Sequence, residues 1–451
     1  MAEHRVYTGF FLVYMGVSTH PYLERRLSMK KLSTAILTAA LALLMLLSLP
    51  AQMTSCALRV KAEEISAGYT RQTDETATVS DAFIAAMADF SLTLANTTVA
   101  MEKEGKANHL ISPLSAMICL SMLANGAKGE TLTQMEAALG MPIEDLNKAL
   151  YAYTSGLYAG DGCKVSLADS IWYRDGDGFT VREEFLQTCA DWYEARQYAA
   201  PFDETTRKDI NKWVEKYTDG MIDSILNDPI PADAVMYLIN ALVFDAKWEE
   251  EYEKKDILSD TFTSRSGAES PVEMMCSEES RYLTVEGGYG VARPYKGNAY
   301  CFVGLLPEEG TDIYDFAASI TGEDWVAMWQ GQIRTTVNTR IPEFTYASDM
   351  RLTPVLQEMG MTDLFDGGLA DLSGIGGGAG NLYCSGVYQK TFIEVNRHGT
   401  KAAAITWGEN KCESAAPIEV QNVYLDRPFV YAIVDTEVGL PLFVGVVTEI
   451  G

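Results

Sequence analysis

Few residues of this chain have the types and spacing that enzyme catalysis requires. Beyond residue 62 there are only two histidines, His109 and His398, and neither accompanies a serine or cysteine in a recognisable nucleophile setting. The sequence has no GxSxG elbow, no HExxH motif and no P-loop. Its 62 acidic residues form pairs by chance, so no catalytic carboxylate dyad can be singled out. We therefore expect a protein that is not an enzyme.

The cysteines and glycines indicate neither a metal site nor a cofactor. Apart from Cys56, seven cysteines are scattered along the chain with no CxxC pair and no metal-ligand spacing. A disulfide framework is not expected, because a chain of 451 residues can build a core without one. The glycine-rich run at residues 374–380 does not join a strand to a helix, so it predicts a flexible loop rather than a phosphate-binding site.

One stretch has a different chemistry, that of a protease substrate. GTKAAAITWGENKCESAAP, residues 399–417, joins a small-residue half to a polar half and has no proline before its last residue. Alternate residues of a strand share a face. One such row is small throughout and consists of Thr400, Ala402, Ala404, Thr406 and Gly408. The other row carries the charge and the bulk and consists of Lys401, Ala403, Ile405, Trp407 and Glu409. This sorting would let the stretch become a strand buried on one face, whereas an ordinary surface loop does not require it.

A secretory signal precedes the main body. Two lysines directly follow Met29, and an apolar run covers about residues 36–49, as in an export signal. Residues 29–62 are therefore the expected signal peptide. Residues 1–28 do not belong to this pattern, and we expect them to be a mis-assigned extension, with translation starting at Met29.

Two ends of this signal compete. MTSC resembles a bacterial lipobox, which would place a lipid on Cys56, although its methionine is not the usual residue. VKA, ending at Ala62, would instead suit an ordinary signal peptidase. In either case the protein is expected outside the cell, freely secreted or lipid-anchored at its surface.

The charge of the chain excludes some partners. The net charge is −27, and the body has no clustered basic run of the kind that nucleic-acid binding requires. Acidity also argues against anionic membrane surfaces, so a lipid on Cys56 is the only membrane contact that we expect.

Helical patterns dominate the front of the body and strand patterns the back. Residues 63–79 are polar and predict a flexible leader, and a helix is expected from Ser80. Ser112 and Pro113 suit the start of a second helix, and Thr133 and Glu136 have capping-box spacing for a third. Strand-like runs follow from about residue 236, interrupted by helical segments near 311–320 and 350–361. This order predicts an α+β fold with mixed sheets, in one domain over residues 80–451.

A series of short phrases in this order resembles the serpin family. The phrases are NHLISPLSAM, INALVFDAKWEEEY, VARPYKGNAYCFVGLLPEEG, RIPEF, LADLSGI, FIEVNRHGTKAAAIT, YLDRPFVYAIVD and LFVGVV. The resemblance covers about residues 80–451 and implies the serpin fold, with three mixed or antiparallel sheets and an exposed reactive-centre loop. Together with the secretory signal, the resemblance implies a secreted serpin of the bacterial type.

The resemblance also implies a suicide inhibitor of serine, or of cysteine, endopeptidases. A protease attacks the exposed loop and forms an acyl-enzyme, which makes a covalent 1:1 complex. The cut loop then inserts into the main sheet as a new strand and distorts the attached protease. No cofactor is implied, and a monomer is expected. The alternative is a non-inhibitory serpin that acts as a binding or carrier protein.

Site residues follow from matching positions in these phrases. The implied hinge of the loop consists of Arg397, Gly399, Thr400, Ala402, Ala403, Ala404 and Thr406. A polar shutter beneath the sheet is implied at Asn108, Ser112, Ser115, Asn240 and Gln389, and the breach where insertion begins is implied at Trp248. Arg397 stands where the family has an acid, Gln389 where it has a histidine, and Ile405 where it has an alanine, so the contact of Arg397 is open to question.

The reactive bond is expected fourteen positions after the hinge glycine, which gives Glu413 and Ser414. Counting back from RPF instead points about four residues later, but insertion length is set from the hinge side. Lys411, Cys412 and Ala415 are alternatives. Glu413 would suit an acid-preferring protease, Lys411 a trypsin-like one and Ala415 an elastase-like one.

Overall fold

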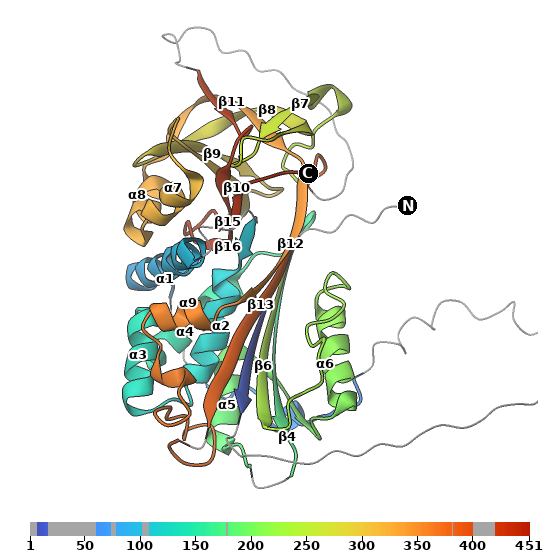
Figure 1. The fold of residues 1–451 in the computed structure, drawn as a ribbon, viewed down its shortest axis with the longest axis vertical. Helices are drawn as coiled ribbons and strands as arrows, with labels where there is room; N and C mark the ends of the chain where they lie inside the picture. The colour runs from blue at the N-terminus through green and yellow to red at the C-terminus, as the bar shows by residue number, and fades with distance from the viewer. Residues whose placement is uncertain are drawn as a thin grey trace, which may run out of the picture.

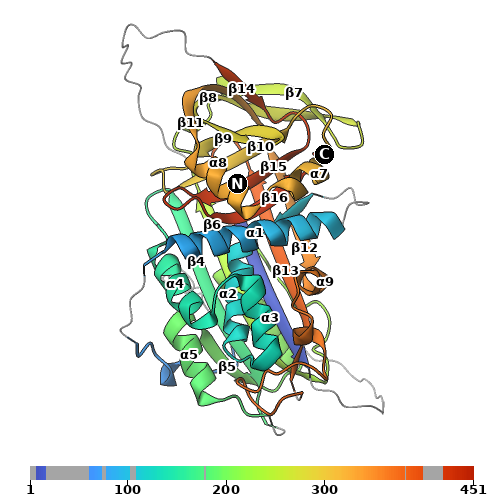
Figure 2. The same ribbon diagram turned by 90° about the vertical axis from the view of Figure 1, so that its left-hand side faces the viewer.

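A computed structural model describes residues 7–16, 60–73, 78–101, 108–176, 179–380, 382–399 and 420–451. Helices pack against two networks of hydrogen-bonded strands, an α+β arrangement as predicted (Figures 1 and 2). The helices are α1 (Asp81–Met101), α2 (Pro113–Ala124), α3 (Gly129–Leu139), α4 (Ile143–Gly156), α5 (Glu183–Tyr193), α6 (Glu204–Tyr217), α7 (Ile313–Ser319), α8 (Gly322–Gln330) and α9 (Thr353–Glu358). Short 3-10 turns cover Ser66–Gly68, Lys254–Asp256 and Asp363–Phe365.

The main sheet has seven strands in the order β12-β13-β1-β6-β4-β5-β2. They are β12 (Phe344–Arg351), β13 (Tyr383–Val395), β1 (Tyr7–Gly16), β6 (Ala234–Ala246), β4 (Cys163–Arg174), β5 (Arg196–Ala200) and β2 (Glu63–Glu64). In Figure 1, α6 covers one face of this sheet and α2 lies on the other. Both faces are packed, because Trp213 of α6 is buried against the sheet and every side chain of α2 is buried. A central strand of this sheet is therefore enclosed on both sides.

The second network has nine strands in the order β14-β11-β8-β9-β10-β15-β16-β3, with β7 paired to β8. They are β3 (His109–Ile111), β7 (Ile257–Thr263), β8 (Glu269–Val285), β9 (Gly288–Pro294), β10 (Tyr300–Pro307), β11 (Ile333–Pro342), β14 (Gln421–Tyr424), β15 (Phe429–Asp435) and β16 (Pro441–Val447). The long β8 pairs with β7 and β11 along most of its length and with β9 at its end. The described strands therefore form two hydrogen-bonded sheets where three were predicted, because the long β8 pairs with β7, β9 and β11 and so joins the strands of the second network.

Local sequence signals set several helix starts but not all. The hydroxyl oxygen of Ser112 accepts from the amide of Ser115 at 3.4 Å, and Pro113 occupies the first turn of α2, as predicted. The predicted capping box at Thr133 and Glu136 is wrong, because α3 already begins at Gly129. Glu136 instead accepts a hydrogen bond from the amide of Ile143, at the start of the next helix.

The segment expected to be a flexible leader, residues 63–79, is held against the body over its described residues 63–73, and residues 60–62 directly before it are held as well. Glu63 and Glu64 form β2 on the edge of the main sheet, beside β5. The amides of Lys61 and Ala62 both donate to the buried carboxylate of Asp209, at 2.9 and 2.8 Å. Backbone pairing and a buried acceptor overrode the polar composition on which the prediction depended.

The glycine-rich run at residues 374–380 is a loop, as predicted, but it is fixed to the body. Ile375 is fully buried, and its carbonyl oxygen accepts from the amide of Arg182 at 2.7 Å. Gly374 donates to the carbonyl oxygen of Gly126 at 3.0 Å. A single buried side chain within the glycines therefore anchors a run that composition alone made look flexible.

Candidate functional site

The centre of the main sheet contains a slot between β13 and β6 that holds one additional strand. β1 fills it and pairs antiparallel with both neighbours (Figure 1). Phe11 lies opposite Gln389 on one side and opposite Asn240 on the other. Two of the predicted shutter residues therefore face each other across the slot, one on each flanking strand. β1 lies within the N-terminal extension, so sequence reasoning about the body did not anticipate it.

The hinge begins where β13 ends. Asn396 and Gly399 form an antiparallel bridge, so the chain turns back on itself at once. Gly399 has a φ of 63°, and a Cβ placed there would lie 1.9 Å from the backbone nitrogen of Trp248. Only glycine fits both the left-handed backbone and this close approach. The hinge glycine therefore lies against Lys247 and Trp248, which follow β6, on the side of β13 that faces the slot.

Arg397 finds a partner at the base of the loop. Its guanidinium makes a two-point contact with the carboxylate of Glu343, with Nε–Oε1 and Nη2–Oε2 distances of 2.8 and 3.0 Å. The amide of Arg397 also donates to Glu343 Oε1 at 2.9 Å. Arg397 therefore has a partner at the base of the loop: its positive charge is paired with the carboxylate of Glu343.

We expect Arg397 and Glu343 to be coupled energetically. The two side chains are 32% and 24% exposed, so solvent screens the pair and it should contribute about 0.5–1 kcal/mol. The measurement is a double-mutant cycle with Arg397→Met and Glu343→Gln, scored by urea unfolding. The same cycle on Arg265 and Asp312, which form an ion pair far along the chain from the hinge, is the matched control. A coupling energy indistinguishable from zero at the hinge would contradict the expectation.

The predicted breach residue Trp248 lies in a buried cluster. It is 1% exposed, its indole Nε1 donates to the carbonyl oxygen of Asn396 at 2.9 Å, and it stacks on Tyr295 at 4.6 Å. The guanidinium of Arg293 lies 5.0 Å from the Trp248 ring and pairs with the buried Glu279. The hinge carbonyl is therefore held by an aromatic group that is itself fixed on two sides.

Arg293, Glu279 and Tyr295 were missed as site residues. For Arg293 and Tyr295 the apolar run VARPY gave a signal, since a lone arginine there must be paired if it is buried. The sequence could not say with what. Glu279 lies in the polar stretch SEESR and gave no such signal.

The shutter forms around Ser112. Gln389 Oε1 accepts from the Ser112 amide at 2.9 Å, and Gln389 Nε2 donates to the Ser112 carbonyl oxygen at 2.9 Å. The Ser112 hydroxyl donates to the carbonyl oxygen of Leu442 at 3.0 Å. Ser115 is adjacent, and its buried hydroxyl oxygen has no hydrogen-bond partner among the described residues. The amide of Gln389 thus ties β13 to the start of α2 with a donor and an acceptor, without a group that titrates near neutral pH.

Asn108 and Asn240 make their contacts elsewhere. Asn108 is bonded to the C-terminal segment, accepting from the amides of Thr448 and Glu449 at 2.7 and 3.1 Å, so it does not join the Ser112 cluster. Asn240 Nδ2 donates to Asp169 Oδ1 at 2.9 Å, across β6 and β4. The predicted cluster is therefore divided between the two sides of the slot, and Asp169 is a member that the sequence did not reveal.

Burial raises the pKa of Asp169 to about 7, against the opposing hydrogen bond from Asn240. The unfolded value is near 3.9, so between about pH 4 and pH 7 the folded chain binds one more proton than the unfolded chain. Asp169 therefore lowers stability as pH rises through this window. We expect the free energy of unfolding of Asp169→Asn, relative to that of wild type, to increase by about 2–4 kcal/mol when the pH is raised from 5 to 8. Urea unfolding of both proteins at the two pH values measures this, and equal pH dependence would contradict it.

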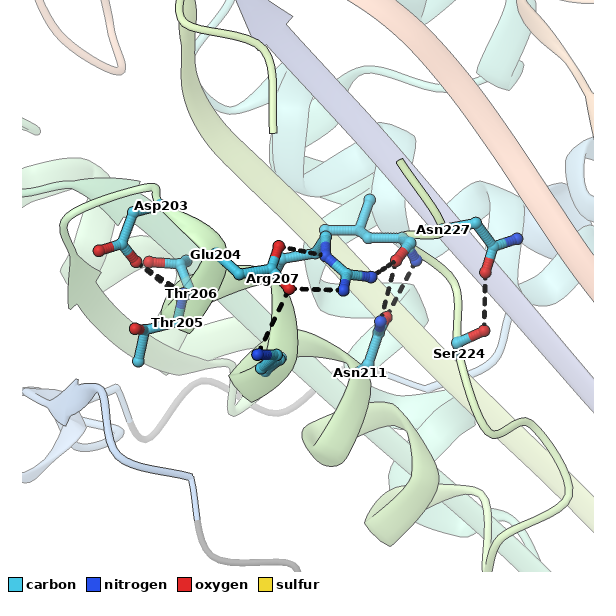
Figure 3. A network of polar contacts seen from close by, with 10 residues as sticks. Asp203, Glu204, Thr205, Thr206, Arg207, Asn211, Ser224 and Asn227 are labelled. Carbon is cyan, nitrogen blue, oxygen red and sulfur yellow. Dashed lines mark hydrogen bonds and ion pairs between the residues drawn. The ribbon is translucent and has the colours of Figure 1, made fainter. Parts of the chain in front are cut away.

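A polar network links α6 to the segment that follows it, over one face of the main sheet (Figure 3). Asn211 on α6 donates to the carbonyl oxygen of Leu226 at 2.9 Å and accepts from the amides of Ile225 and Leu226 at 3.0 and 2.9 Å. Arg207 donates to the same carbonyl oxygen at 2.8 Å while paired with Glu204. The segment that follows α6 is also linked to β13, because Lys390 Nζ lies 3.4 Å from the carbonyl oxygen of Ser224. α6 and this segment therefore form one unit covering that face of the sheet.

The reactive loop itself lies outside the described residues. This applies to the hinge positions Thr400, Ala402, Ala403, Ala404 and Thr406, and to the proposed bond region Lys411, Cys412, Glu413, Ser414 and Ala415. Cys56 lies outside them as well. The six cysteines that the structure does describe are free thiols.

Comparison with known proteins identifies the family. A family model described as Serpin (serine protease inhibitor) matches residues 85–450, so this chain belongs to the serpin family. The fold is similar to the crystal structure of a thermophilic serpin, tengpin, in the native state. The TM-score is 0.80 with 41% identity, over 87% of this chain and 100% of that one.

Curated relatives come from distant organisms. Iripin-8 of Ixodes ricinus is 27% identical over 355 residues, covering 75% of this chain and 87% of the relative. Serpin B9 of Homo sapiens is 30% identical over 308 residues, covering 66% of this chain and 81% of the relative. Serpins are generally protease inhibitors that form complexes with their targets, rather than catalysts, so at the level of the family the predictions of fold and class are confirmed.

Proposed function

We propose that this chain is an irreversible suicide inhibitor of serine endopeptidases that traps the acyl-enzyme by inserting its cleaved loop into the main sheet. The observation that carries the proposal is the slot between β13 and β6 together with the hinge that opens into it. A strand antiparallel to both neighbours fits there, as β1 demonstrates. A loop leaving β13 through the turn at residues 396–399 would enter with the same antiparallel direction.

The register of the hinge supports the face sorting seen in the sequence. Continued from the Asn396–Gly399 bridge, it pairs residue 400 with 395, 402 with 393, 404 with 391, 406 with 389 and 408 with 387. Those β13 residues are at most 2% exposed. Directly paired residues share a face, so the small row would meet the buried face and the bulky row the other. A one-residue slip would bury Lys401 and Trp407 instead.

The length of the slot supports the reactive-bond assignment. β1 occupies ten positions, starting opposite Ile393. In the register continued from the Asn396–Gly399 bridge, Ala402 would occupy the first of these ten positions and, counting along the chain, Lys411 would occupy the tenth. The bond between Glu413 and Ser414 would then reach the far end of the sheet, carrying an attached protease across the molecule.

The alternative of a non-inhibitory carrier drew some support from Arg397. The unusual charge of that residue is matched by Glu343, which weakens this argument for it. The position of Gly399 beside Trp248 and the register that continues from the Asn396–Gly399 bridge favour insertion of the loop when β1 does not occupy the slot.

The proposed function is tested with a panel of proteases. The chain starting at Met29 is incubated with trypsin-like, elastase-like and acid-preferring serine proteases. We expect a complex stable in SDS with at least one of them and, by mass spectrometry, release of a fragment cut between residues 411 and 416. Cleavage without any stable complex across the panel would overturn the inhibitory function. A stable complex with a cut outside residues 411–416 would overturn only the register.

We also propose that the protein is exported, as a bacterial-type secreted or lipid-anchored serpin. The bonds from the amides of Lys61 and Ala62 to Asp209 support a mature chain that begins before residue 61, and so favour Cys56 over cleavage after Ala62. Mass analysis of the mature N-terminus distinguishes the two: a lipid-modified Cys56 supports the anchor, and a chain starting at Glu63 refutes it.

A further inference from the structure

A cavity of about 560 Å³ lies beside β4, between α4 and α5. β5 pairs with β4 from Ser170 onwards, and the cavity is lined by the three residues of β4 that come before. Its size is that of a small-molecule site. We propose that this cavity binds a small organic cation with an aromatic or apolar body.

The charged group of the cavity is a buried carboxylate. Asp169 is 7% exposed and lines the cavity, and its Oδ1 already accepts from Asn240 at 2.9 Å. Arg196 is the one basic residue among the described lining residues, and its guanidinium lies 2.9 Å from Glu64. Glu194 adds a second acid to the lining. Arg196 is paired with Glu64, and the guanidinium of Arg71 lies on the outer rings, so the charged group at the inner end of the cavity is Asp169, which favours a cation over an anion there.

The walls of the cavity are aromatic. Tyr151 and Trp192 meet edge to face at 6.3 Å, and Tyr193 and Tyr217 complete the lining on other sides. Aromatic faces attract cations and provide the apolar area that a small ligand must bury. A carboxylate enclosed by such rings is the arrangement that recognises substituted amines.

The chain itself shows that these rings accept a cation. The guanidinium carbon of Arg71 lies 3.6 Å from the centre of the Tyr151 ring and 5.1 Å from that of Trp192. Arg71 belongs to the segment docked before α1, and its guanidinium also donates to the carbonyl oxygen of Asp191. Two independent observations point to an organic cation as the ligand. One is the guanidinium of Arg71 on the outer ring pair, and the other is the buried carboxylate of Asp169.

The test uses phenethylamine and its neutral isostere phenethyl alcohol, titrated by calorimetry into the folded protein at pH 8. The amine should bind at least about tenfold more tightly than the alcohol, because only the amine pairs with Asp169. Asp169→Asn should remove this preference. Asp175→Asn, which makes the same charge change at an exposed position just after β4, should keep it. Equal binding of the two compounds, binding of neither, or an unchanged preference in Asp169→Asn would overturn the proposal.

A second measurement covers the case in which Asp169→Asn does not fold. In wild type the amine should bind more tightly at pH 8 than at pH 6, as Asp169 ionises while the amine stays protonated. The other groups facing Asp169 are Cys119 on α2 and Cys189 and Tyr193 on α5, and burial raises the pKa of each, so they stay neutral. Glu194 and Arg196 also line the cavity. Affinity for the amine that does not change between the two pH values would overturn the assignment to Asp169.

Discussion

A Thr400→Arg variant, made in the chain that starts at Met29, is expected to be cut by its target protease without trapping it. If the register of the Asn396–Gly399 bridge continued into the sheet, residue 400 would pair with Val395, which is 1% exposed, so insertion would carry the guanidinium into the buried face of the sheet. Burying an unpaired charge costs several kcal/mol or more, which is enough for insertion to stall while deacylation proceeds. We expect the number of inhibitor molecules consumed per trapped protease to rise by about tenfold or more, which corresponds to about 1.4 kcal/mol. Gel analysis of complex and cleaved product measures this ratio.

The matched control is Ala403→Arg. Residue 403 belongs to the other row, opposite Phe392, which is only half-buried, so an arginine there keeps access to solvent. This variant should trap the protease nearly as well as wild type. Full inhibition by Thr400→Arg would contradict the proposed insertion of the loop. Loss of trapping in Ala403→Arg with trapping retained in Thr400→Arg would show that the register is shifted by one residue. Equal loss in both variants would contradict the sorting of the two rows.

The fold could be predicted from the sequence because its signals are patterns of residues close together in the chain, or the order of such patterns along the chain. Ser112 and Pro113 mark a helix start through contacts within three residues of each other. The alternation in β13 keeps residues 387, 389, 391, 393 and 395 buried, and period-two patterns of this kind are visible in a sequence. The serpin phrases add order along the chain. Each of these signals needs neighbours in sequence, not partners in space.

The site could be predicted only in part because its contacts join distant segments. Gly399 was predicted from its place in the hinge, but the reason that no other residue fits is the backbone of Trp248, over a hundred residues earlier. The partner of Arg397 is one of many glutamates, and nothing local marks Glu343 among them. Asp169 looks like one more acid in a strand until Asn240 and the helices enclose it. Residue types can be identified from a sequence, whereas burial and pairing depend on the folded chain.

The N-terminal strand leads to the other large expected effect. A chain that starts at Met1 should be a poor inhibitor, and the chain that starts at Met29 should inhibit. In the longer chain Tyr7–Gly16 occupies the slot and pairs with both β13 and β6, so the cleaved loop has no free strand position to enter. We expect the rate of complex formation to differ by about tenfold or more, with the longer chain cleaved as a substrate instead. Start at Met29, or removal of the signal peptide on export, would each leave the slot free in the mature protein.

A proline in β1 separates occupancy of the slot from any other effect of the additional residues. Val13 lies opposite Val387 and Leu238, at the centre of the sheet, where a proline lacks the N–H that a central strand needs. Val13→Pro in the chain starting at Met1 should therefore restore trapping towards the level of the Met29 chain. Val13→Thr retains the N–H and the β-branched shape, so it should leave the long chain inactive. If both long-chain variants inhibit as well as the Met29 chain, β1 does not compete with the loop. If neither variant inhibits, residues other than β1 cause the block. The reason is that a strand with a missing ladder hydrogen bond should be displaced from the centre of a sheet by a loop that forms the complete ladder.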